Sequence, residues 1–140
     1  MVVSPGGPQM TASARTRVGL DLVRISDIAS SVQRFGDRFL HRIFTRDELV
    51  YCLSAPQTSS SRLAARFAAK EAARKVLSLD QEGIGWQSTE VVRAPNGSCE
   101  LALHGKARAL ARKAGFIGFS LSMTHESDYA SAVVVGERRR

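Results

Sequence analysis

The stretch that most constrains the fold is Arg62–Leu77, which reads RLAARFAAKEAARKVL. It holds six alanines and neither proline nor glycine. Alanine and long unbranched side chains favour helix, so the stretch predicts one long helix. On a helical wheel Glu71 lies between Phe67 and a face of small residues (Ala64, Ala68 and Ala72). Another segment, a metal ion or a phosphate can approach a carboxylate closely on such a face.

The simplest interpretation of Glu71 is a surface ion pair with Lys75, four residues along the helix, which is worth about 0.2–0.5 kcal/mol. A second acid changes that interpretation. Asp21 stands in the middle of the apolar run VGLDLVRI, which predicts a buried strand. A buried acid costs free energy unless it is paired or holds a cation, although a strand residue can also point to solvent.

Asp21 and Glu71 lie on elements that we expect to pack together, so they would form a site of hard oxygen ligands. Mg²⁺ suits such a site, because it commonly takes one or two carboxylates and completes its shell with waters and substrate phosphate oxygens. Arg66, Lys70 and Lys75 in the long helix supply positive charge for a phosphate. The sequence therefore predicts a magnesium–phosphate site.

The composition is that of a single soluble domain. The chain has 140 residues, 44% of them hydrophobic and 24% charged. No apolar run approaches the roughly 20 residues of a membrane span, and no secretion signal is evident, so we expect a cytoplasmic protein. The net charge of +7 favours a polyanionic partner: a nucleic acid, a phosphorylated small molecule or an acidic protein. We expect residues 1–16 to be disordered, residues 17–136 to form the domain, and residues 137–140 to form a basic tail.

The remaining sequence predicts short elements joined by turn residues. Thr45 and Glu48 have the capping-box spacing that opens a helix. Residues 94–97 carry turn chemistry between two strands. The expected elements in chain order are a strand over 18–25, helices over 26–35, 37–43 and 45–52, a polar linker over 55–61, the long helix, a glycine-containing loop over 80–85, strands over 86–93 and 98–103, a helix over 105–114, and strands over 116–124 and 129–135. Hairpins dominate, so we expect an α+β fold with a mostly antiparallel sheet packed on a long central helix.

Three motifs together resemble holo-[acyl-carrier-protein] synthase, the small class of 4′-phosphopantetheinyl transferases. They are G-L-D-L-V near the N-terminus, R-F-A-A-K-E-A-x-x-K in the long helix, and S-x-T-H-E near the C-terminus. The likeness runs from Val18 to Val135. It implies the 4′-phosphopantetheinyl transferase fold, commonly a homotrimer with sites at subunit interfaces.

The resemblance also implies roles for particular residues. Asp21 and Glu71 match the family's magnesium ligands, and Lys75 matches its helix lysine near the pyrophosphate, so these three are the implied catalytic residues. Arg66, Lys70, Lys75 and His125 are the implied contacts of coenzyme A, with His125 able to serve a neighbouring subunit. The implied contacts of the carrier protein are Arg34, Arg38, Phe39 and Arg42.

The reaction implied is transfer of 4′-phosphopantetheine from coenzyme A to a serine of an apo acyl carrier protein, with release of adenosine 3′,5′-bisphosphate. Phosphoryl transfer asks a protein chiefly for positioning and charge neutralisation. Glu71, through a metal-bound water, is our choice for the acceptor of the serine proton, with His125 as the alternative. Whether the carrier serves fatty-acid, and hence lipid, biosynthesis or polyketide synthesis is left open.

The sequence departs from the family pattern in places. The glycine-rich loop expected after the long helix is longer and more acidic here, over residues 79–85, which puts the loop's contacts with coenzyme A in doubt. The rival hypothesis is a small basic nucleic-acid-binding domain without catalysis. It explains the net charge but gives Asp21 and Glu71 no role, and neither an aromatic–basic strand motif nor a helix-turn-helix pattern supports it.

Overall fold

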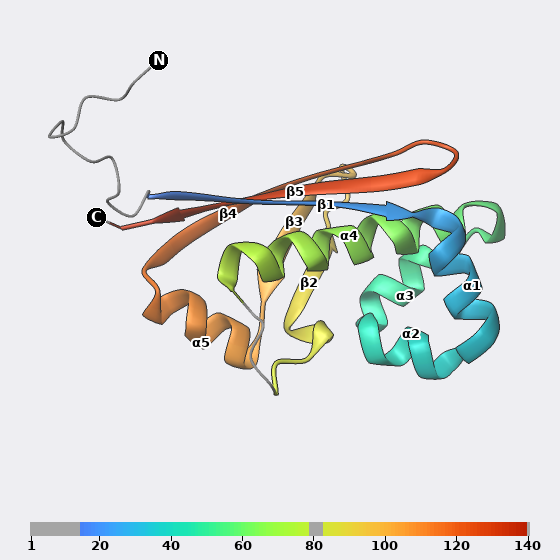
Figure 1. The fold of residues 1–140 in the computed structure, drawn as a ribbon, viewed down its shortest axis with the longest axis horizontal. Helices are drawn as coiled ribbons and strands as arrows, with labels where there is room; N and C mark the ends of the chain where they lie inside the picture. Colours follow the sequence, from blue (N-terminus) through green and yellow to red (C-terminus); the bar gives the residue numbers. More distant parts are fainter. Residues whose placement is uncertain (1–14, 79–82, 140) are drawn as a thin grey trace, which may run out of the picture.

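The computed structural model describes residues 15–78 and 83–139. The chain begins with a strand and three short helices, and the long helix α4 follows them (Figure 1). A hairpin, one more helix and two long strands complete it. The elements are β1 (Thr16–Arg24), α1 (Ile25–Phe35), α2 (Asp37–Ile43), α3 (Arg46–Cys52), the 3₁₀ turn η1 (Pro56–Thr58), α4 (Ser59–Leu77), the 3₁₀ turn η2 (Trp86–Ser88), β2 (Thr89–Arg93), β3 (Cys99–Leu103), α5 (Gly105–Lys113), β4 (Phe116–His125) and β5 (Tyr129–Arg138).

The strands in the described part of the chain form two antiparallel sheets. One has the order β1-β5-β4, and β2 pairs with β3 in the other. Helix α4 runs beneath β1 and β5 and has β2 on its other side (Figure 1). The predicted α+β class with antiparallel strands is confirmed. The hairpin, however, makes a sheet of its own instead of extending the larger one.

Small residues let α4 approach the larger sheet closely. Ala68, Ala69, Ala72 and Ala73 of α4 are completely buried. A Cβ atom added to Gly19 of β1 would lie 2.1 Å from the Ala72 carbonyl oxygen, far inside van der Waals contact. Only glycine fits there, because it has no side chain to separate the two backbones. This contact fixes the part of β1 that carries Asp21 against α4.

The helices α1 to α3 pack on the N-terminal half of α4 around Phe44 and Leu63, which are buried. The predicted capping box at the start of α3 is confirmed. The Glu48 backbone N–H donates to Thr45 Oγ1 at 3.2 Å, and the Thr45 backbone N–H donates to Glu48 Oε1 at 2.8 Å. The box also turns the Glu48 side chain inward, where it is only 2% exposed.

Two of the predicted boundaries around α4 are wrong. The expected polar linker over residues 55–61 ends early, because η1 runs directly into α4 and the helix begins at Ser59. The expected strand over residues 86–93 begins only at Thr89. Residues 86–88 are instead a 3₁₀ turn in which Trp86 stacks on Phe67 of α4, with ring centroids 5.2 Å apart.

The expected basic tail over residues 137–140 is also wrong in part. Glu137 and Arg138 lie in β5, where Glu137 pairs with Thr16 of β1. Thr16 was expected to be disordered, but its hydroxyl donates to the Glu137 carboxylate at 3.0 Å. The pairing of the two chain ends therefore lengthens both strands. Residues 1–14 of the segment expected to be disordered, and residues 79–82 of the expected loop, lie outside the described residues.

Candidate active site

Asp21 of β1 and Glu71 of α4 lie at the contact between these two elements, close enough for the charge of Asp21 to raise the pKa of Glu71. Lys75, one helical turn beyond Glu71, joins them: its ammonium group lies 3.3 Å from Asp21 Oδ1. It also donates to the Leu20 carbonyl oxygen at 2.7 Å. The Lys75 side chain is about half exposed and that of Asp21 is 18% exposed, so the group opens to solvent. The three residues that sequence reasoning selected as catalytic thus form one cluster.

The pKa of Glu71 reflects the proximity of the two acids. Partial burial raises the pKa of Glu71, and the negative charge of Asp21 raises it further. Arg74 and Lys75 act in the opposite direction but do not cancel the rise. Two carboxylates that repel each other at a solvent-accessible place are stabilised when a cation binds between them.

The donor set fits a magnesium ion. No group of three or more His, Cys, Asp or Glu side chains suited to a metal occurs among residues 15–78 and 83–139. Zinc sites usually need such a group of nitrogen or sulfur ligands. Mg²⁺ instead needs only one or two carboxylates when waters and substrate phosphate oxygens fill its remaining positions. The Asp21–Glu71 pair supplies these two carboxylates.

Lys70 does not lie at this site, which corrects the expectation that it binds coenzyme A. Its side chain is completely buried on the opposite side of α4. The ammonium group lies 2.8 Å from Glu48 Oε1 and donates to the carbonyl oxygens of Trp86 and Thr89. A lysine with its three donors satisfied inside the protein cannot reach a phosphate at the surface.

Arg66 and His125 lie apart from the Asp21–Glu71 pair. Arg66 is buried and its guanidinium stands over the Tyr51 ring, on the α3 and β2 side of α4. His125 is exposed at the end of β4, and β5 separates that strand from β1. It borders a groove with Ile25 and residues 57, 60, 61, 126 and 127. Within one subunit the structure therefore does not bring these two residues to the acids.

The residues expected to contact a carrier protein lie on α1 and α2. Arg34, Arg38 and Arg42 are exposed. Phe39 is only partly exposed, because it packs edge-on against Phe44 with ring centroids 6.2 Å apart. Phe35, at the end of α1, is a large apolar side chain that is half exposed in this region. Gly36, with a positive φ of 55°, separates α1 from α2.

Comparison with known proteins agrees with this geometry. The family model of the 4′-phosphopantetheinyl transferase superfamily matches residues 17–134. The holo-[acyl-carrier-protein] synthase of Koribacter versatilis is 45% identical over 120 residues, which cover 85% of this chain and 95% of that protein. The corresponding enzyme of Gloeobacter violaceus is 39% identical over 118 residues, covering 84% and 89%.

The chain belongs to this family. The resemblance and the assignment as a transferase, a holo-[acyl-carrier-protein] synthase, are thereby confirmed.

Solved structures of the family share the fold. The ACPS–CoA complex of Chronobacterium ammoniagenes superposes with a TM-score of 0.80 at 29% identity, covering 89% of this chain and 98% of that one. The holo-[acyl-carrier-protein] synthase of Helicobacter pylori in complex with coenzyme A gives a TM-score of 0.75 at 28% identity, covering 86% and 99%. Both of these relatives were solved with coenzyme A.

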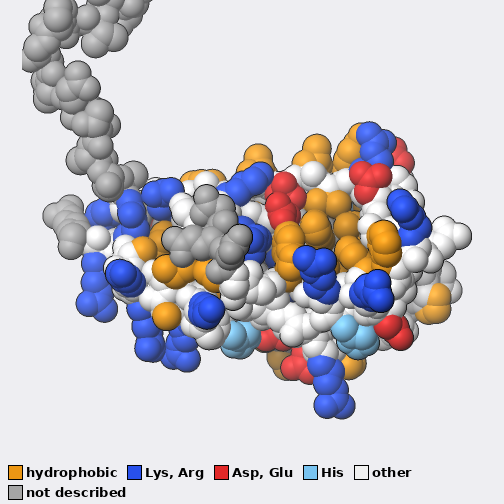
Figure 2. Space-filling model, turned by 60° about the horizontal axis from the view of Figure 1, so that its bottom comes forward, with side chains coloured by type: hydrophobic (Ala, Val, Ile, Leu, Met, Phe, Trp, Pro, Cys, Tyr) orange, Lys and Arg blue, Asp and Glu red, His pale blue; other side chains and the backbone are white. Residues whose placement is uncertain are grey.

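The rival hypothesis of a nucleic-acid-binding domain rested on the net charge. Figure 2 shows that Lys and Arg side chains gather at the end of the molecule that holds α5. The exposed basic residues of that helix are Lys106, Arg108, Arg112 and Lys113. The similarity to holo-[acyl-carrier-protein] synthases over most of the chain favours the enzyme over this rival. None of the described helices is long and apolar enough to cross a membrane.

Proposed function

We propose that this holo-[acyl-carrier-protein] synthase moves the 4′-phosphopantetheine group of coenzyme A onto a serine of an acidic apo acyl carrier protein in the cytoplasm. The reaction depends on Mg²⁺ and releases adenosine 3′,5′-bisphosphate. The observation that carries the proposal is the convergence of Asp21 and Glu71 across the contact between β1 and α4, with Lys75 joined to Asp21 at 3.3 Å. The coenzyme A complexes of the structural relatives support the donor substrate.

In this proposal Asp21 and Glu71 hold Mg²⁺. When bound, the ion supplies Lewis-acid stabilisation of a diphosphate. The serine oxygen of the carrier forms a bond to the β-phosphorus of coenzyme A, and the bond from that phosphorus to the bridging oxygen breaks. The bridging oxygen and its electron pair leave with adenosine 3′,5′-bisphosphate. Lys75 is half exposed and has a flexible stem, so it can turn from Asp21 to a phosphate oxygen.

Glu71 is the proposed acceptor of the serine proton. Burial and the charge of Asp21 raise its pKa in the absence of a cation, but Mg²⁺ held by both acids would lower it again, so the assignment rests on the position of Glu71 beside the proposed ion. His125 is the alternative acceptor. In the single subunit it lies on another strand of the sheet, so it would reach the reacting atoms only from a neighbouring copy.

A homotrimer is part of the proposal. The face of β1 that points away from α4 exposes three apolar side chains: Val18, Leu20 and Leu22 are 63%, 62% and 64% exposed. Val133 and Val135 of β5 share that face, because they pair with Leu20 and Val18. A continuous apolar strip on a sheet is a strong reason for association. In such an assembly His125 of one subunit could serve a neighbour's acids.

The test is incubation with coenzyme A, Mg²⁺ and a panel of apo carrier proteins, with mass spectrometry to detect an added phosphopantetheine. We expect Asp21→Ala and Glu71→Ala each to abolish transfer while the circular dichroism spectrum stays unchanged. Glu100→Ala, which removes an exposed carboxylate on β3, is the matched control and should transfer normally. Loading of a carrier at the normal rate by either active-site variant would show the metal assignment to be wrong.

A further inference from the structure

Helix α5 presents a basic surface that the proposed reaction does not use. Its inward side chains, Ala107 and Ala111, are buried. At 100° per residue, the opposite side of the helix forms an exposed arc of about 160°. The charged residues on this arc are Lys106, Arg108, Arg112 and Lys113. The helix contains no acidic residue, so it turns a purely basic face to solvent.

The two chain ends extend this surface. The Arg139 backbone N–H donates at 2.9 Å to the carbonyl oxygen of Gly115, just after α5. The Arg138 backbone N–H donates at 2.8 Å to the carbonyl oxygen of Arg15. These bonds bring both ends of the sheet next to α5, and Arg15, Arg17 and Arg139 are exposed there. We call residues 15–17, 105–115 and 137–139 the basic end (Figure 1, Figure 2).

The basic end holds the whole charge excess of the chain. It contains eight basic residues and one acid, Glu137, so its net charge of +7 equals that of the chain, and the remaining basic and acidic residues balance. Within residues 15–78 and 83–139, none of Arg108, Arg112 and Lys113 has a carboxylate partner. Like charges gathered on one surface repel one another, and a bound polyanion relieves that repulsion.

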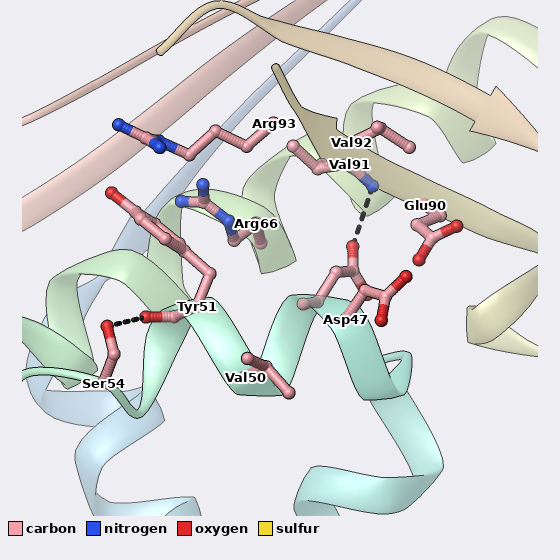
Figure 3. Close-up of a pocket in the computed structure, with 10 residues that line it drawn as sticks. Asp47, Val50, Tyr51, Ser54, Arg66, Glu90, Val91, Val92 and Arg93 are labelled. Atoms are coloured by element: carbon pink, nitrogen blue, oxygen red, sulfur yellow. Dashed lines mark hydrogen bonds between the residues drawn. The ribbon is translucent and has the colours of Figure 1, made fainter. Parts of the chain in front are cut away.

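The surfaces expected to bind the carrier protein and coenzyme A do not account for this charge. Basic and acidic residues nearly balance over residues 24–52, which include the expected carrier contacts. Helices α1 and α2 also lie at the opposite end of the molecule from α5 (Figure 1). The pocket between α3, α4 and β2 mixes charges: Figure 3 shows Arg66 and Arg93 at one end of it and Asp47 and Glu90 at the other. The basic end therefore suits a different polyanion.

An exposed isoleucine distinguishes between the possible polyanions. Ile117 follows Gly115 by two residues and is 58% exposed. A nucleic acid backbone offers it no apolar contact, and the basic end has no aromatic, Asn or Gln side chain to stack on bases or to read their edges. A membrane surface offers both kinds of contact. Its anionic headgroups attract Lys and Arg, and the apolar layer just beneath them accepts an isoleucine side chain.

We propose that the basic end binds the surface of an anionic lipid bilayer, with its Arg and Lys side chains at the headgroups and Ile117 inserted between them. The attachment is peripheral, because the apolar side of α5, Ala107 and Ala111, is buried in the protein and stays there. Clusters of four to eight basic residues are typical of surfaces that bind anionic lipids. This inference does not depend on the transfer reaction.

The experiment measures how much of the full chain sediments with vesicles of phosphatidylcholine alone and of phosphatidylcholine mixed with phosphatidylglycerol. The double variant Arg108→Gln/Arg112→Gln removes two exposed charges of the basic end. Arg24→Gln/Arg46→Gln removes two exposed charges near α1 and α3 and is the matched control. Ile117→Ser tests the apolar contact. Duplex DNA is titrated separately as the other polyanion, and circular dichroism checks that each variant is folded.

We expect the wild type to bind the vesicles that contain phosphatidylglycerol, to leave phosphatidylcholine vesicles unbound, and to dissociate at high salt. Arg108→Gln/Arg112→Gln should weaken binding about thirtyfold, and its control should bind as the wild type does. Ile117→Ser should weaken binding about fivefold. The proposal is overturned if the anionic vesicles are not bound, if the two double variants bind them equally, or if Ile117→Ser binds them as tightly as the wild type. In the last case, tighter binding of duplex DNA than of vesicles would assign the basic end to a nucleic acid.

Discussion

Removing one partner of the buried ion pair between Lys70 and Glu48 should destabilise the fold strongly, although the family resemblance implied a role for Lys70 in binding coenzyme A. The two side chains are fully buried, and 2.8 Å separates Lys70 Nζ from Glu48 Oε1. The pair links the first turn of α3 to α4, and Lys70 also donates to the carbonyl oxygens of Trp86 in η2 and Thr89 at the start of β2. Burial lowers the pKa of Lys70, and the charge of Glu48 opposes that effect.

The perturbation is Lys70→Met, which keeps the length of the side chain and removes its charge. Glu48 would remain buried with two backbone donors, Thr45 and Val91, each at 2.8 Å. Breaking a buried pair by removing one partner costs about 3–5 kcal/mol, and the two surviving hydrogen bonds place the loss near 3 kcal/mol. With a urea m-value of about 1–3 kcal/mol/M, the unfolding midpoint should fall by about 1–3 M.

The assay is urea unfolding followed by far-ultraviolet circular dichroism, with Lys113→Met on the exposed face of α5 as the control. The control should change the free energy of unfolding by less than about 0.5 kcal/mol. Adding Glu48→Gln to Lys70→Met should restore part of the loss, because the unpaired buried charge is then gone. If Lys70→Met lowers the free energy of unfolding by less than about 1 kcal/mol and raises the Michaelis constant for coenzyme A, the structural role is refuted. Lys70 would then contact coenzyme A instead.

Other changes test the packing, the electrostatics and the carrier surface. Gly19→Ala places a Cβ atom against the Ala72 carbonyl oxygen and should cost about 1–3 kcal/mol in thermal unfolding; an unchanged melting temperature would contradict the close contact of β1 with α4. The pKa of Glu71 is raised in the folded state, so wild-type stability falls as the pH rises from about 4 towards neutrality. In the presence of a chelator Glu71→Gln should therefore be more stable than the wild type at pH 7, by less than about 1 kcal/mol because solvent screens the charges. Below pH 4 the two proteins should be equally stable. A variant less stable than the wild type at pH 7 would show that ionised Glu71 stabilises the fold, contrary to this reasoning. Arg38→Glu should raise the Michaelis constant for the carrier protein several-fold and leave that for coenzyme A unchanged, whereas equal effects on both would exclude a carrier contact.

Local patterns in the sequence predicted the features that depend only on residues close together in the chain. The alanine-rich stretch predicted α4, and the Thr45–Glu48 spacing predicted the capping box, because backbone propensity and a bond across three residues need no distant partner. The family motifs also singled out Asp21 and Glu71 before their proximity was known. The ends of β5 were harder to predict, since the partner that extends it is β1, more than a hundred residues away in the chain.

The sequence by itself determined which residues could hold a metal ion or a phosphate, namely two acids and a set of basic side chains. It also determined an alanine face of the long helix that a strand can approach closely. Tertiary structure decided which of the basic residues lie near the two acids and which lie elsewhere. Lys75 stays at the acids, Lys70 turns inward to Glu48, and Arg66 joins Arg93 of a distant strand around Tyr51. The physical reason is that helix α4 is covered on several sides, so a lysine and an arginine a few residues apart meet different neighbours. What each charge does depends on those neighbours.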